Sequence, residues 1–119
     1  MTDPETATRA IVNILSTGDL ARISSAVAQD YVDHQGLDDI EIRGTDGFRH
    51  VVKAVHSYSD VRVTIEDMVA AGDTAAVRLR WYGVDPAGQA VVRETLDLLR
   101  FADGLLVEHW GAQLFLRES

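Results

Sequence analysis

The chain has 119 residues, a formal net charge of -8 and no cysteine. Its length predicts one domain, residues 1–119, around one hydrophobic core. The acidic balance argues against nucleic-acid and anionic-membrane partners, whose phosphates would be repelled, and the missing thiols exclude disulfides and zinc–thiolate sites.

We expect neither a secretory leader nor a membrane-spanning segment. The opening "MTDPETATRA" lacks the basic and apolar regions of a secretory leader. No apolar run reaches the roughly 18 residues that a membrane-spanning helix needs. With the absence of cysteine, these features lead us to expect a cytoplasmic protein.

The first half of the chain has helical spacing. Asp3 and Pro4 are typical of a helix start, and Gly18 of a helix end. Asp19 caps a second predicted helix, which carries its apolar stripe to Val27. The segment "DYVDHQGLDD" then predicts a short extended stretch followed by a loop. A third helix is expected from about residue 45 and buries Phe48, Val51, Val52 and Val55.

After Ser59 the apolar period changes from helical to alternating. Two hairpins are expected, with turns at Gly72–Asp73 and Asp103–Gly104, joined by a turn at residues 85–88. Three helices followed by four long strands predict an α+β fold. We expect a cone-shaped, curved antiparallel sheet that wraps around the helices and encloses a pocket.

Asp97 is the most informative polar residue of the predicted sheet, because it lies among leucines in "ETLDLLRF". A buried carboxylate there needs a partner. One interpretation is an ion pair with an arginine of the same or the neighbouring strand, namely Arg78, Arg80 or Arg93. The other is a pocket carboxyl with a shifted pKa.

His109 and Gln113 lie on one face of the last predicted strand, and Trp110 on the other. Gly111 is a possible bulge, which would change this parity. A strand histidine can be structural or catalytic, and both interpretations stand. His34, at the start of the predicted loop, is either solvent-facing or at the rim of the pocket. Asp33, His34 and His109 together form a weak candidate for a metal site.

Several segments carry a family resemblance that covers nearly the whole chain. The segments "YVDHQG", "GTDGFRHVV", "AAGDTAAVRLRWYG" and "DLLRFADGLLVEHWG" resemble SnoaL-like polyketide cyclases and ketosteroid isomerases of the nuclear transport factor 2-like superfamily. The resemblance implies a cofactor-independent isomerase or cyclase that moves a proton on a hydrophobic carbonyl compound. Apart from the resemblance, the mixed polarity of both faces of the predicted sheet suggests a second subunit and hence a homodimer, and the absence of His-x-x-x-His and Glu-x-x-His spacings predicts no bound metal.

The resemblance assigns roles to particular residues. His34 falls where the isomerases have their general base, and Asp97 where they keep a protonated carboxyl in the oxyanion hole. The expected catalytic residues are therefore His34, Asp97 and His109, with His34 or His109 as the base. The expected substrate-binding residues are Tyr31, Trp81, Arg93, Trp110 and Gln113.

Three alternatives stay open at this stage. Leu114 lies at the position where the cyclases tend to have an acidic residue, and this, with the aliphatic lining of the pocket, favours a non-catalytic protein that binds a small apolar ligand. Arg93 and Asp97 match part of the residue set of limonene epoxide hydrolases. The strand face with Arg78, Arg80 and Glu94 is also a candidate interface of a dimeric assembly module.

Overall fold

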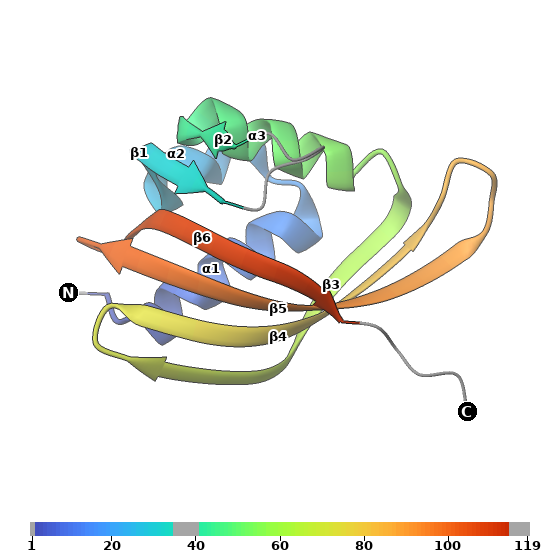
Figure 1. Ribbon diagram of the computed structural model, residues 1–119. Coiled ribbons are helices and arrows are strands. Elements are labelled where there is room, and N and C mark those ends of the chain that lie inside the picture. The colour runs from blue at the N-terminus through green and yellow to red at the C-terminus, as the bar shows by residue number, and fades with distance from the viewer. Residues whose placement is uncertain (1, 35–40, 115–119) are drawn as a thin grey trace.

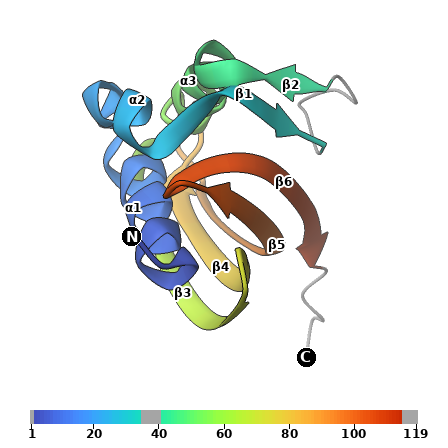
Figure 2. The same ribbon diagram turned by 90° about the vertical axis from the view of Figure 1, so that its left-hand side faces the viewer.

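One curved sheet wraps around helix α1 in the computed structural model, which describes residues 2–34 and 41–114 (Figures 1 and 2). The sheet order is β2-β1-β6-β5-β4-β3. The elements are α1 (Pro4–Thr17), η1 (Leu20–Arg22), α2 (Ile23–Ala26), β1 (Val27–Asp33), β2 (Ile42–Arg43), α3 (Gly44–Val55), β3 (Ser59–Ala71), β4 (Thr74–Val84), β5 (Ala90–Ala102) and β6 (Leu105–Leu114). The α+β prediction is confirmed, and the sheet is curved but not closed.

The sheet differs from the prediction in one respect that determines the site. The described strands pair antiparallel except β1 and β6, which run parallel. The sheet is therefore mixed rather than purely antiparallel. β6 consequently has two long neighbours, β1 on one side and β5 on the other, and side chains from all three strands can meet on its concave face.

The first helix begins and ends where its sequence predicts. The Asp3 carboxylate accepts a hydrogen bond from the Thr6 amide at 2.7 Å, and Gly18 adopts a left-handed conformation with φ 76°. The second helix is shorter than predicted. Asp19 caps only a 3-10 turn and a four-residue helix, because Val27 already begins β1 and pairs with β6. Residues 35–40 of the predicted loop lie outside the described residues.

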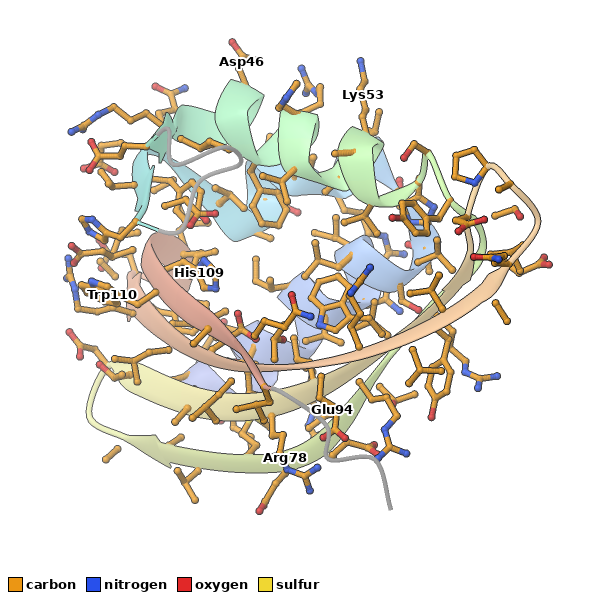
Figure 3. The ribbon with its side chains drawn as sticks, turned by 45° about the vertical axis from the view of Figure 1, so that its right-hand side comes forward. Asp46, Lys53, Arg78, Glu94, His109 and Trp110 are labelled. Atoms are coloured by element: carbon orange, nitrogen blue, oxygen red, sulfur yellow. The ribbon has the colours of Figure 1, made fainter. Side chains whose placement is uncertain are left out.

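Both hairpins form at the predicted turns, where Gly72 and Gly104 have positive φ. The bulge between β5 and β6 lies near Arg100 and Phe101, whereas Gly111 pairs in register with Asp97. The alternation of β6 is thus uninterrupted from His109 to Gln113. His109 therefore faces the concave side of the sheet, and Trp110 faces the convex side (Figure 3).

The core fills the space between the concave face of the sheet and helices α1 and α3. Ile11 and Leu15 of α1 and Phe48 of α3 are buried there, and Tyr31 of β1 packs edge-on against Phe48 with 5.8 Å between ring centroids. Asp33 and Asp97 are buried among these apolar residues. None of the helices in the described ranges is long and apolar enough to cross a bilayer.

Candidate active site

A histidine bridges two buried carboxylates at the concave face of the sheet. His109 Nδ1 lies 2.9 Å from Asp33 Oδ1, and His109 Nε2 lies 2.7 Å from Asp97 Oδ1. The side chains of the two aspartates are 7% exposed and that of His109 is 17% exposed. Both ring nitrogens are therefore engaged, which is the arrangement of an imidazolium between two acceptors.

The register of the sheet brings these three side chains together. Asp33 on β1 pairs directly with His109 on β6. Asp97 on β5 pairs with Gly111, two residues beyond His109, so the imidazole reaches it along a diagonal on the same face. Each residue thus comes from a different strand, and the parallel β1–β6 pair supplies one of the two acids.

The hydrogen-bond chain continues from Asp97 to a tryptophan. Thr95 donates to Asp97 Oδ2 at 2.6 Å, and Trp81 Nε1 donates to the Thr95 hydroxyl oxygen at 2.8 Å. These bonds fix the carboxylate of Asp97 from the side opposite to His109. Five side chains from β1, β4, β5 and β6 therefore form one connected network.

His109 carries a positive charge at neutral pH. Burial by itself lowers the pKa of an imidazole, but the hydrogen bonds to Asp33 and Asp97 outweigh it and raise the pKa of His109 to about 9. Tyr31 is buried in the same place. Burial, together with the charge of the Asp33 carboxylate and a hydrogen bond to it, raises the pKa of its hydroxyl, which stays neutral.

Two hollows adjoin the network. A cavity of about 70 Å³ is enclosed by apolar side chains of α1, α3 and the sheet, with Tyr31, Asp33, Asp97 and His109 in its wall. A wider cleft of about 190 Å³ lies next to it and includes Arg93 and Thr95. Trp81 lines both hollows, so its indole separates the cleft from the buried acids.

His34 does not share the cavity of His109, contrary to the expectation from the sequence. Asp33 faces inward, so the next residue of the chain points outward, where His34 Nε2 lies 2.7 Å from Glu108 Oε2. Its ring stacks on Trp110 with 5.0 Å between centroids. The weak metal-site hypothesis loses its geometry for the same reason: no three acid or histidine side chains in the described ranges are arranged to hold a metal ion.

The other candidate residues are distributed unevenly around the site. Tyr31 and Trp81 line the cavity, and Arg93 lines the cleft. Gln113 shares the concave face with His109 and pairs with Thr95, but its side chain is exposed. Trp110 lies on the convex face, 38% exposed, and is not part of either hollow.

The sequence interpretation of Asp97 as a partner of an arginine is wrong. Arg78 and Arg80 lie on the convex face, and both bind Glu94, at 2.8 and 3.0 Å. Figure 3 shows Arg78 and Glu94. From the sequence, Asp33 is a candidate metal ligand only, although alternation places it on the same face as Tyr31. That alternation was the signal that could have identified it as part of the pocket.

Comparisons with known proteins agree with this architecture. A family model described as SnoaL-like polyketide cyclase matches residues 5–113. A search of the curated proteins found no match.

Solved structures with the same fold include IdmH from Streptomyces antibioticus, which is 23% identical, with 94% of this chain and 92% of that chain covered and a TM-score of 0.81. A SnoaL-like polyketide cyclase from Agrobacterium tumefaciens is 16% identical, with coverage of 95% and 92% and a TM-score of 0.80. A protein from Catenulispora acidiphila with a ketosteroid isomerase-like fold, solved with trimethylamine, is 17% identical, with coverage of 93% and 86% and a TM-score of 0.78. The match of the family model over nearly the whole chain shows that this protein belongs to the SnoaL-like polyketide cyclase family.

Proposed function

We propose that the protein is a cofactor-independent isomerase or cyclase that transfers a proton on a hydrophobic carbonyl compound. One observation carries the proposal: a charged imidazole lies between two buried carboxylates in the wall of an otherwise apolar cavity. Such a cavity selects an apolar substrate, and the charged groups within it interact strongly because little water screens them. Membership in the family supports the same class of reaction.

Asp97 is the general base in this proposal, and His109 is not. His109 already holds a proton at neutral pH, and both of its nitrogens bind carboxylates. Asp97 also binds Thr95, which lines the cleft, so it is the acid nearer to the side from which a substrate enters. The role of base, which the sequence assigned to a histidine, therefore passes to a carboxylate.

In the reaction, Asp97 takes a proton from the carbon next to the carbonyl group, and the electrons of the broken C–H bond move into the enolate. The positive charge of the His109 imidazolium stabilises the negative charge that forms on the oxygen. Asp97 then returns the proton to another carbon in an isomerisation. In a cyclisation, the enolate carbon attacks a second carbonyl carbon and the resulting alkoxide takes the proton.

Hydrogen–deuterium exchange tests this proposal without knowledge of the natural substrate. A panel of aromatic and alicyclic ketones is incubated in D₂O with the protein, and loss of the α-proton signal is followed by NMR. Asp97→Asn is expected to lower the exchange rate by about 10²- to 10⁴-fold, the range for a general base. Asp46→Asn, which removes an exposed carboxylate on the outer side of α3, is the matched control (Figure 3). Equal rates for the two variants would disprove the role of Asp97.

A non-catalytic binding protein is the second candidate, because Leu114 stands near the position where related cyclases tend to have an acid. Tight binding of ketones without exchange would favour it. The panel also includes an epoxide, because conversion of an epoxide to a diol would point instead to the epoxide hydrolase-like activity that Arg93 and Asp97 suggested.

A further inference from the structure

The cleft beside the cavity is almost entirely apolar, with one exception. It lies between the end of α3 and strands β3, β4 and β5, and its walls include Val55, Tyr58, Val61 and Val91. Arg93 is the one charged residue in its wall. A cation at the edge of an apolar cleft gives the site two kinds of affinity, one for an apolar body and one for an anion.

Arg93 also differs from the other arginines of the described ranges. Arg9, Arg22, Arg43, Arg49, Arg78, Arg80 and Arg100 each form an ion pair with a carboxylate. Arg62 stacks over the ring of Tyr82 at 4.3 Å. Neither kind of partner is found for Arg93 in the described part of the chain. Carboxylates are abundant in a protein with a net charge of -8, yet none in the described ranges pairs with the Arg93 guanidinium at the cleft.

We propose that the cleft binds an aromatic or alicyclic carboxylate, with the ring system against Trp81 and the carboxylate on Arg93. A guanidinium presents a planar pair of donors that matches the two oxygens of a carboxylate. Arg93 pairs with Trp81 across strands β5 and β4, so both groups reach the same ligand. The identification of this ligand as the substrate rests on the proposed function, whereas its binding does not.

Fluorescence of Trp81 measures the binding directly. The chain has two tryptophans, so Trp110→Phe leaves Trp81 as the only one. In this background, 2-naphthoate, an anion at pH 7, is titrated in parallel with 2-naphthamide, its neutral analogue. The anion is expected to bind about tenfold more tightly, as a charge-assisted hydrogen bond would give. Arg93→Gln is expected to remove this preference and leave the amide unaffected.

Three further variants make the result specific. Arg22→Gln removes an exposed arginine on η1 and is expected to change neither affinity. Val91→Phe narrows the cleft without adding a tryptophan and is expected to weaken both ligands. Arg93→Lys keeps the charge without the paired donors and is expected to fall between wild type and Arg93→Gln. Retention of the anion preference in a folded Arg93→Gln protein, or equal affinity of the two ligands for the parent protein, would overturn the proposal.

His109→Asn separates this inference from the proposed function. This variant is expected to bind 2-naphthoate like its parent, because His109 does not line the cleft. If 2-naphthoate binds through Arg93 but no ketone exchanges its proton, the carboxylate site stands and the proposed reaction fails. If ketones exchange their protons but the preference for the anion is absent, the proposed reaction stands and the carboxylate site fails.

Discussion

Asp33 and His109 face each other across the parallel strands β1 and β6, with 2.9 Å between Oδ1 and Nδ1. On the opposite face of the same two strands, His34 and Glu108 form a second acid–histidine pair at 2.7 Å. The acid comes from β1 in the inner pair and from β6 in the outer pair, where the histidine is His34, the residue directly after β1. The inner pair lies in an apolar cavity and the outer pair lies at the surface. The same two types of side chain are therefore paired once away from water and once in contact with it.

The inner pair makes the free energy of unfolding depend on pH. The pKa of His109 is about 9 in the folded protein, against about 6.5 for an unperturbed histidine. The stabilisation of the folded state by protonated His109 is therefore complete below pH 6.5 and is lost as the pH rises through 9. We expect a loss of about 3 kcal/mol across this window, from urea unfolding at successive pH values. The free energy of unfolding of His109→Asn should not fall across this window. An equal fall in the wild type and in this variant would contradict the assignment to His109.

Asp33 is expected to maintain the charge of His109. Asp33→Asn removes one of the two carboxylates that raise the pKa of the imidazole, so that pKa should fall towards its ordinary value. NMR titration of the His109 ring measures this directly. The alkaline limb of the exchange rate should move to lower pH by a similar amount. Asp30→Asn, an exposed acid on the same strand, is the control and should shift neither.

Trp81 is expected to control the size of the ligand that reaches Asp97. Trp81→Phe keeps an aromatic wall but loses the bond to Thr95, which should cost about 1 kcal/mol of stability. Trp81→Ala joins the cleft to the cavity and should cost about 2 kcal/mol, less than for a fully buried indole. Among the panel ketones, Trp81→Ala should favour bulkier ones relative to Trp81→Phe. An unchanged order of preference would show that the indole is not a barrier.

His34 should matter little for proton transfer, because it lies on the convex face. We expect His34→Asn to change the exchange rate less than about tenfold, well below the loss for a catalytic acid or base. His109→Asn, in contrast, removes the charge beside the enolate and should lower the rate by about 10²-fold or more. A larger loss in His34→Asn than in His109→Asn would reverse this assignment.

The convex face is expected to mediate the homodimer that the sequence predicts. Register places Val69, Ala76, Leu98 and Trp110 side by side on β3, β4, β5 and β6, and Leu98 is 40% exposed. Self-association would bury this apolar row. Light scattering should show Leu98→Asp at half the mass of the wild type. Lys53→Asp, which changes an exposed position on α3, should keep the wild-type mass (Figure 3).

The helices and hairpins were predictable because their signals are local. Asp3 and Gly18 mark the limits of α1, and the glycines at positions 72 and 104 mark the turns. β1 was harder to assign, because its burial does not alternate regularly and its partner strand lies far along the chain. Asp33 and His109 are 76 residues apart, and no local pattern connects them.

The partner of Asp97 could not be identified without the register. The sequence places Arg78, Arg80 and Arg93 within reach in principle, and a buried acid next to arginines suggests an ion pair. In the sheet, Arg78 pairs with Leu96 and Arg80 with Glu94, both on the convex face. Asp97 faces the other way, so the residue that meets it is His109 from β6.

The exchanged acid–histidine pairs also bear on how the chain selects its strand register. A slip of β1 by one residue towards the start of β6 would set Asp33 opposite Glu108 and His34 opposite His109. Like would then oppose like at both positions, with two carboxylates together and two imidazoles together. Such a misaligned sheet would be penalised while the chain folds, before any ligand is present. Asp33 and His109 of the candidate site, together with His34 and Glu108 at the surface, would thus also disfavour a misfolded state.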